Sequence, residues 1–241
     1  MRESSNQIDQ SPDRPINEWQ ARVVQCSRCV RLREYCARVA REKKRAHRDE
    51  EYWGRPVPGF GDPEAALLIV GLAPAAHGGN RTGRVFTGDS SGDFLMRALH
   101  RAGFANIPTS THAGDGLALT GAYIAAAVRC APPDNKPLPS EIEACLPWLA
   151  GEMACLPRLR AVVALGRIAF DATLRLLGER GARVRPRPPF GHGLVHRFAG
   201  DTPALVASYH PSRQNTNTGR LTEAMFDEVF TTAKAFLGSG L

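Results

Sequence analysis

The cysteines are the first residues in this sequence whose types and spacing suggest chemistry. Four of the six form two spaced pairs, Cys26 with Cys29 and Cys130 with Cys145. Four thiolates bind either a zinc ion or an iron–sulfur cluster. Structural zinc sites usually use two closely spaced pairs, whereas Cys130 and Cys145 stand 15 positions apart, a spacing that suits a [4Fe–4S] cluster. Spacing alone leaves both metals open, and the other two cysteines fit a packing role in the core.

A glycine-rich stretch, residues 71–89 (GLAPAAHGGNRTGRVFTGD), is the second candidate. The spacing of Gly78 and Gly83 is that of a phosphate-binding loop, but Arg84 and Val85 stand where that loop needs Lys and Ser or Thr. The alternative is a connecting loop that needs its glycines for turns. Three further residues exceed what a turn requires and favour a functional loop: His77, Phe86 and Asp89.

Two polar residues follow other apolar runs. Asn135 lies in CAPPDNKP, and its amide offers a donor and an acceptor that together match one edge of a nucleobase. His210 ends an apolar run and precedes Pro211, which favours extended backbone at the tip of a strand. A turn asparagine or a strand-end histidine is often merely structural. Hydrogen-bonding neighbours favour a functional histidine: Ser212, Arg213, Gln214, Asn215 and Asn217.

Four apolar runs of strand length precede or follow these residues, at positions 65–73, 121–130, 161–166 and 204–210. None alternates cleanly between apolar and polar residues, which is typical of parallel strands buried on both faces. Helical segments separate the runs, at 90–102, 139–155, 167–179 and 221–236. This order predicts one α/β domain with helices on both faces of a parallel sheet. Ligands of such sheets bind beyond the carboxyl ends of the strands, so the polar loops are expected to form a single site.

Composition sets the outer bounds. The chain has 241 residues, 43% of them hydrophobic, which excludes a mostly disordered, collagen-like or coiled-coil protein. No apolar run approaches the ~20 residues of a membrane span, and the polar N-terminus has no secretory h-region. Residues 1–16 are expected to form a disordered arm, and residues 17–241 a single domain.

Charge adds a possible partner. Lys and Arg number 31 against 24 Asp and Glu, a net +7, and the pI is near 9.4. A polyanionic partner and mere solubility both fit this excess. The helical segment 17–51 is strongly basic over residues 31–48, and these side chains either form a solvated face or contact phosphates.

The motifs together resemble one known family. CSRC, GLAPAAHGGNRTGRVFTGD, VRCAPPDNKP, ALGRIAF and SYHPSRQNTNTGR occur in the order found in family 5 (type B) uracil-DNA glycosylases. The resemblance covers roughly residues 17–238. It implies a three-layer α/β/α sandwich around a short, mainly parallel, four-stranded sheet. It also implies that Cys26, Cys29, Cys130 and Cys145 hold a [4Fe–4S] cluster rather than zinc.

The resemblance implies roles for the site residues as well. Phe86 is expected to stack on a flipped base, Asn135 to read its amide edge and His210 to contact its carbonyl oxygen O2. The family's usual first motif places Ala73 where other branches carry a water-activating Asp, and Asp89 is the nearest acidic candidate. Residues expected to line the base pocket are Gly71, Ala73 and His77. Residues expected to contact DNA are Arg81, Arg84, Ser212, Arg213, Gln214 and Asn215.

The function implied is that of a DNA repair glycosylase acting on uracil, and also on hypoxanthine and related deaminated bases, in DNA. Such an enzyme works as a monomer in the bacterial cytoplasm, without a membrane. The alternative is a non-catalytic iron–sulfur protein that binds damaged DNA. Base release separates the two, because only the glycosylase leaves an abasic site.

Overall fold

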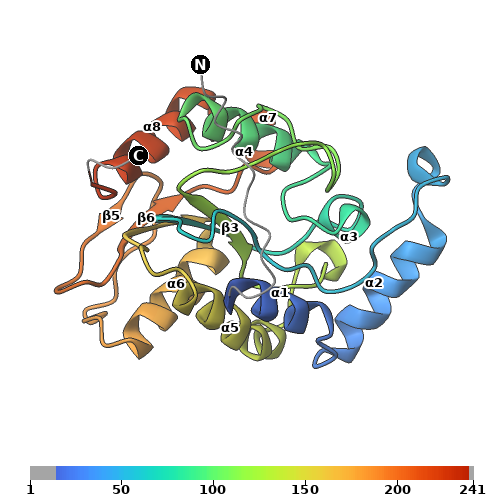
Figure 1. Cartoon of the computed structure of the whole chain (residues 1–241), viewed down its shortest axis with the longest axis horizontal. Coiled ribbons are helices and arrows are strands. Elements are labelled where there is room, and N and C mark those ends of the chain that lie inside the picture. Colours follow the sequence, from blue (N-terminus) through green and yellow to red (C-terminus); the bar gives the residue numbers. More distant parts are fainter. Residues whose placement is uncertain (1–14, 239–241) are drawn as a thin grey trace, which may run out of the picture.

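The computed structural model describes residues 15–238, which form an α/β domain around one six-stranded sheet (Figure 1). The strand order is β1-β3-β2-β4-β6-β5. The four central strands pair in parallel and lie within the four predicted runs: β2 (Leu67–Gly71), β3 (Ala122–Ala126), β4 (Ala161–Leu165) and β6 (Ala204–Ser208).

The prediction of a four-stranded sheet is wrong, because the sheet has two further strands, one at each edge. β1 (Phe60–Gly61) pairs antiparallel with β3, and β5 (Val195–His196) pairs antiparallel with β6. Each has only two residues, too few to leave a pattern in the sequence. The sheet is therefore mainly parallel with a short antiparallel strand at each edge.

Helices cover both faces of the sheet and make three layers. The helices of the chain are α1 (Pro15–Val24), α2 (Val30–Glu42), α3 (Gly79–Thr82), α4 (Ser90–Arg101), α5 (Pro139–Ala154), α6 (Arg167–Glu179), α7 (Arg213–Asn217) and α8 (Glu223–Lys234), with 3-10 turns η1 (Arg45–His47) and η2 (Pro133–Asn135). Figure 1 shows α4 and α8 on one face of the sheet and α1, α5 and α6 on the other.

Strand side chains explain this layering. Alternate residues of β2 point to opposite faces, so Leu67 and Ile69 join the core under α4 and α8, while Leu68 and Val70 join the core under α5 and α6. All four are fully buried. A run that is apolar at every position is thus what a strand covered on both sides requires.

The domain begins earlier than expected. Residues 1–14 of the expected disordered arm lie outside the described residues, but Pro15 and Ile16 already belong to α1. Ile16 is 2% exposed and packs into the core under α5 and α6. None of the helices in residues 15–238 has the length and apolar composition to cross a membrane.

Candidate active site

The loops after β2 and β6 meet beyond the carboxyl ends of the parallel strands, where the order of strands and loops predicted a site. The rings of Phe86 and His210 stack with centroids 5.9 Å apart and planes 29° apart. A Cβ on Gly71, at the end of β2, would lie 2.6 Å from the Phe86 ring. A Cβ on Gly166, after β4, would lie 3.3 Å from that of His210. Glycine at both strand ends therefore lets the two rings lie directly against the sheet.

Phe86 occupies an unusual backbone conformation. Its φ of +50° is in the left-handed region, which costs a bulky residue about 1–3 kcal/mol unless the surroundings impose it. The residues on either side supply that restraint. Arg84 donates from Nε to Thr87 Oγ1 at 3.0 Å, which bridges the turn across Phe86, and the Gly88 amide donates to the Ser110 carbonyl at 2.8 Å.

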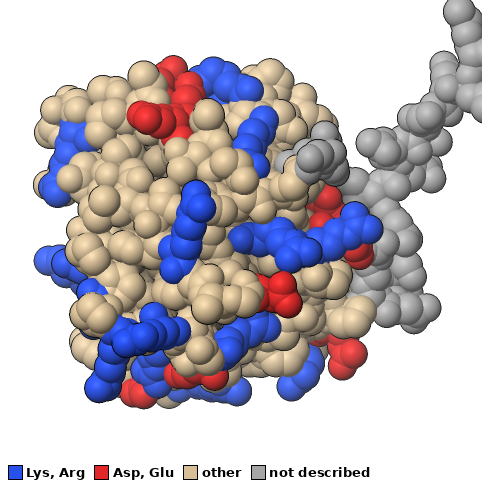
Figure 2. Space-filling model, turned by 90° about the vertical axis from the view of Figure 1, so that its left-hand side faces the viewer, with Lys and Arg blue, Asp and Glu red and all other residues tan. Residues whose placement is uncertain are grey.

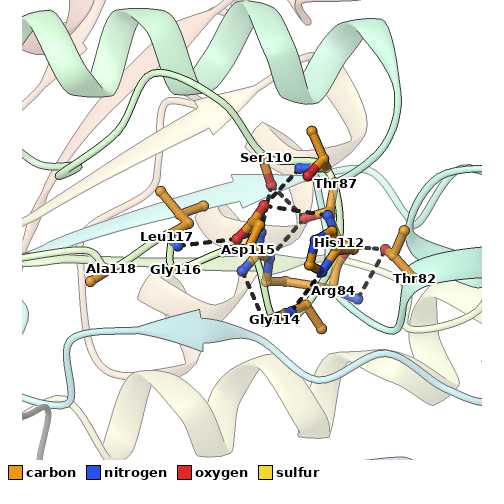
Figure 3. Close-up of polar contacts among 12 residues, drawn as sticks. Thr82, Arg84, Thr87, Ser110, His112, Gly114, Asp115, Gly116, Leu117 and Ala118 are labelled. Atoms are coloured by element: carbon orange, nitrogen blue, oxygen red, sulfur yellow. Dashed lines mark hydrogen bonds and ion pairs between the residues drawn. The ribbon is translucent and has the colours of Figure 1, made fainter.

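The restraint ends in a buried ion pair (Figure 3). Arg84 Nη2 lies 2.8 and 2.7 Å from the two carboxylate oxygens of Asp115 and also donates to Ser110 Oγ. Asp115 in turn accepts bonds from the amides of Thr111 and Leu117. Although burial alone raises the pKa of Asp115, the Arg84 guanidinium and these amides outweigh it and hold that pKa at about 2. The loop of residues 105–120 is thereby tied to the turn that carries Phe86.

Two of the three arginines expected to contact DNA, those of the glycine-rich loop, are buried. Arg84 is 7% exposed and its guanidinium is committed to Asp115, Ser110 and Thr87. Arg81 is 9% exposed, pairs with Glu50 and donates to the carbonyls of His77 and Gly88. Both side chains hold the glycine-rich loop together from inside, a structural role that the sequence analysis did not expect.

Asp89 has a structural position that also suits chemistry. It is the N-cap of α4, where its Oδ1 accepts the amides of Ser91 and Gly92, each at 3.0 Å. A Cβ on Gly78 would meet its other oxygen, Oδ2, at 2.1 Å, so that oxygen points into the glycine-rich loop. Burial raises the pKa of Asp89, and the two amide bonds partly offset this. A capped carboxylate of this kind has one oxygen held and one oxygen available.

His77 and Ala73 lie on the side of the loop that faces the N-terminal helices. His77 Nδ1 is 3.0 Å from the hydroxyl of Tyr52, and burial together with nearby Lys44 lowers the pKa of His77. Ala73 packs against the apolar cluster that contains Cys26, Cys29, Cys130 and Cys145. The first motif thus connects the stacked rings of Phe86 and His210 with the cysteines.

Asn135 lies on the neighbouring loop with its side chain exposed. Its φ of +57°, in the turn η2, is one that asparagine tolerates better than most residues. Arg31 on α2 donates to the carbonyl of the next residue, Lys136, and pairs with Glu141 at the start of α5. No described contact joins Asn135 to Phe86 or His210.

The last loop is built around His210. Asn215 Nδ2 donates to the His210 carbonyl at 2.9 Å, and Ser212 caps α7. Arg213 donates to Ser90 Oγ at 3.1 Å, which joins this loop to the start of α4, and Gln214 is exposed. Burial lowers the pKa of His210 to about 4, so its imidazole is neutral at physiological pH.

The four cysteines expected to bind metal gather in one place. Cys130 and Cys145 are buried, Cys26 and Cys29 are half-buried, and all four pack into the same small cluster. Trp148 Nε1 lies 3.2 Å from Cys26 Sγ, and the Arg129 amide lies 3.5 Å from Cys145 Sγ. Among residues 15–238, however, no three His, Cys, Asp or Glu side chains converge closely enough to hold a single metal ion.

One buried group next to these cysteines has unmet hydrogen bonds. Arg129 is 1% exposed and pairs with Glu152, which is fully buried. Its Nε and Nη1 nevertheless have no partner. A buried guanidinium of this kind fits an acceptor-rich, anionic group in its neighbourhood, such as a thiolate-bound cluster.

Comparison with known proteins places the chain. Residues 58–234 match the family described as the uracil DNA glycosylase superfamily. The chain belongs to that superfamily. It is 54% identical over 216 residues to a type-5 uracil-DNA glycosylase of Thermus thermophilus, covering 90% of this chain and 95% of the relative. It is 51% identical over 224 residues to one of Mycobacterium tuberculosis (92% and 82%), and 34% identical over 163 residues to a type-4 uracil-DNA glycosylase of Pyrobaculum aerophilum (67% and 74%).

Two features of this type-5 superfamily member escaped the sequence analysis. His192 Nδ1 accepts the Tyr209 amide at 3.2 Å, and the two rings stack, so His192 supports the backbone just before His210. Asp115 was missed because it lies 31 residues from Arg84. The only local signal for His192 was a glycine on each side of it. The only local signal for Asp115 was that it is an acidic residue in a glycine-rich loop.

Proposed function

We propose that this protein is a DNA repair glycosylase that hydrolyses the N-glycosidic bond of uracil and leaves an abasic site. The observation that carries the proposal is the stacked pair of Phe86 and His210, built on glycines at the carboxyl edge of the sheet. Membership of the superfamily and the names of the type-5 relatives support the same reaction.

The substrate base has to leave the duplex before it is cleaved, at a cost of a few kcal/mol. In this proposal Phe86 stacks on the flipped base, while the backbone of Gly71 and Ala73 lines the pocket and His77 borders it. Asn135, whose amide is exposed and uncommitted to described partners, pairs with the amide edge of uracil. Its position on a separate loop suits a residue that closes on the base after flipping.

Cleavage moves negative charge onto uracil and positive charge onto the sugar. His210, neutral because burial lowers its pKa to about 4, donates a hydrogen bond to O2 of the leaving base. A neutral imidazole that carries a proton on one nitrogen remains a donor and needs no protonation step. One donor of this kind is worth roughly 3–4 kcal/mol when it matches an oxyanion-hole group.

Asp89 is proposed to orient the attacking water and to stabilise the sugar cation. Its Oδ1 is held by two amides of α4, which fixes the carboxylate and leaves Oδ2 for this task. The raised pKa of Asp89 reflects loss of water around it, which also makes the carboxylate a stronger base. Ala73 cannot perform this function, since it has no polar side-chain atom.

The strand is proposed to be held by the last loop. Ser212, Arg213, Gln214 and Asn215 follow His210, and the side chains of Arg213 and Gln214 are exposed toward the DNA backbone or the gap that the flipped nucleotide leaves. Arg213 is already linked to Ser90 beside Asp89, so DNA bound by this loop lies next to the proposed water site.

Cys26, Cys29, Cys130 and Cys145 are proposed to hold a [4Fe–4S] cluster. Each thiolate of a cluster binds a different iron atom, so the four sulfurs need not converge on one point. This agrees with the finding that no three His, Cys, Asp or Glu side chains among residues 15–238 converge on a single metal position. The amide and indole donors at Cys145 and Cys26 suit anionic sulfur, and so does the unpartnered guanidinium of Arg129. When bound, the cluster supplies folding energy by joining the N-terminal helices to the loop after β3 and to α5.

The remaining aspects of the proposal concern substrate range and setting. Hypoxanthine and related deaminated bases are proposed as further substrates, as the resemblance to the family 5 enzymes implies. The protein is proposed to act as a monomer in the cytoplasm, where DNA is its partner.

The test is single-turnover base release from a duplex with one uracil, followed by alkali cleavage of the abasic strand. Scission of the uracil strand, with none in a matched thymine duplex, is the expected result. Tight binding without scission, from protein with its full iron content, contradicts the proposal and supports the non-catalytic damage binder. Inosine in place of uracil tests the wider range in the same assay.

A further inference from the structure

The net charge of the protein is confined to one segment. Residues 28–48 contain nine Lys and Arg against two Glu, a net +7, which equals the net charge of the whole chain. The rest of the chain therefore carries 22 basic and 22 acidic residues and is neutral. This segment comprises α2, η1 and the residues that flank them, and we refer to it as the basic arm.

The basic arm lies along the rim of the molecule beside the proposed site. Figure 1 shows α2 rising past α3 to the short coil of η1, at the end of the molecule away from β5. At one end of the arm, Arg31 contacts the Lys136 carbonyl, next to Asn135. At the other end, Lys44 and His47 are close enough to His77 to lower its pKa. The arm thus borders both the loop of Asn135 and the glycine-rich loop.

Most basic side chains of the arm have no acidic partner. Arg31 is paired with Glu141, but no ion pair within residues 15–238 involves the other arginines and lysines of the arm. Arg41, Lys44 and Arg45 are exposed and have no described side-chain contact. The apolar side of α2 is already used, because Leu32, Cys36 and Val39 are buried against the domain. The outward face is therefore available, and its arginines and lysines outnumber its two acidic residues, the exposed Glu34 and Glu42.

The opposite end of the molecule differs. Figure 2 shows the face at the β5 end, where basic side chains form separate groups with acidic ones among them. Elsewhere in the described chain, Arg160 lies 4.0 Å from Asp201, and Arg187 pairs with Asp171. A solvated helix in a neutral protein would show the same mixture. The excess of nine basic over two acidic residues in the arm instead points to a polyanionic partner.

Building on the proposed glycosylase function, we propose that the basic arm is a second DNA-binding surface, which follows the phosphates of one strand away from the flipped nucleotide. The 13 residues of α2 span roughly 20 Å, which is the length of about six phosphates along a strand. The arm binds the backbone without reading bases, and it anchors duplex on one flank of the lesion.

The test compares two variants that each lose three exposed arginines or lysines. One is R41Q/K44Q/R45Q in the arm. The matched control is R180Q/R183Q/R185Q, which follows the C-terminal end of α6, the helix that runs away from the site. Affinity for a 30-base-pair duplex carrying one uracil is measured between 50 and 200 mM salt, with single-turnover uracil release at saturating enzyme as the second readout.

We expect the arm variant to lower the slope of log affinity against log salt by roughly 2.7, because each phosphate contact contributes about 0.9. Wild type then loses roughly 40-fold more affinity across this range than the variant does. The control keeps the wild-type slope, and all three proteins release uracil at the same saturated rate. Shortening the duplex on one flank of the uracil, and not on the other, removes the difference between wild type and arm variant.

An arm variant with the slope of the control overturns the inference, whatever the wild type does to uracil. If the wild type binds DNA but releases no uracil, the proposed function is refuted. The effect of the arm variant on the salt dependence of DNA affinity can still be measured in that case. If shortening the duplex on either flank of the uracil reduces the difference between wild type and arm variant equally, the arm does not bind one flank. The inference is then wrong.

Discussion

Replacing Asp115 by asparagine tests how the fold imposes the strained backbone of Phe86. The change keeps the size of the side chain but removes the charge that faces Arg84 Nη2 at 2.7 Å. Both partners are largely buried, with side chains 8% and 7% exposed. Arg84 would then be a buried cation without an anion, and the asparagine would place an amide group against its N–H groups.

The magnitude follows from the pKa of Asp115. A fall from 3.8 to about 2 corresponds to about 2 kcal/mol of stability at neutral pH. Removal of one partner from a buried pair typically costs about 3–5 kcal/mol, so about 2 kcal/mol is a lower bound. Because the folded pKa is depressed, this stability is present above about pH 4 and is lost as pH falls toward 2. At pH 3 roughly half of it remains.

The assay is urea unfolding at pH 7 and pH 3, with D227N as the control. Asp227 forms a similar two-oxygen pair with Arg101, but both side chains are 37% exposed, so its loss should cost less than about 1 kcal/mol. D115N should also slow single-turnover uracil release roughly 10-fold or more, since the turn of Phe86 loses its restraint. Equal destabilisation by D115N and D227N, or a D115N effect that is as large at pH 3 as at pH 7, would refute this reasoning.

Three further variants test the proposed site. D89N keeps an oxygen to cap α4 but loses the carboxylate, so uracil release should slow about 10²-fold with stability unchanged, while D93N releases uracil at the wild-type rate. H210A should lose 10²- to 10³-fold in single-turnover rate. In wild type that rate should show no histidine titration between pH 5 and 8, because burial holds the His210 pKa at about 4; a step near pH 6.5 contradicts a neutral donor. C145S should purify with less iron and without the brown absorption, and C155S with the full complement; equal iron in both rejects the ligand set.

The parts of the fold that were predictable are those where one physical requirement acts on consecutive residues. Burial on both faces makes β2, β3, β4 and β6 apolar throughout, and the rule that parallel strands end at one edge brings Gly71, Phe86 and His210 together. The edge strands have two residues each and impose no such pattern. The position of the site therefore follows from the sequence, while the width of the sheet does not.

Side-chain partners distant in the sequence were not predictable. Arg81 and Arg84 were expected at phosphates because a basic residue in a glycine-rich loop is a common anion ligand. Each is instead paired with a carboxylate 31 residues away, and only the folded chain brings Glu50 and Asp115 to them. The basic arm shows the converse, since eight of its nine arginines and lysines form no ion pair within residues 15–238, although Glu34, Glu42 and residues 49–51 lie near them in the sequence.

The two short edge strands have a consequence for how the protein behaves in a crowded solution. A long exposed edge strand offers unpaired amides and carbonyls to a second sheet and promotes aggregation. Here β1 and β5 pair with β3 and β6 over two residues each, so each edge offers only a brief stretch of regular backbone. Without these strands, β3 and β6 would be the exposed edges, with five residues of regular backbone each. A two-residue strand at each edge leaves less regular backbone for a second sheet to pair with.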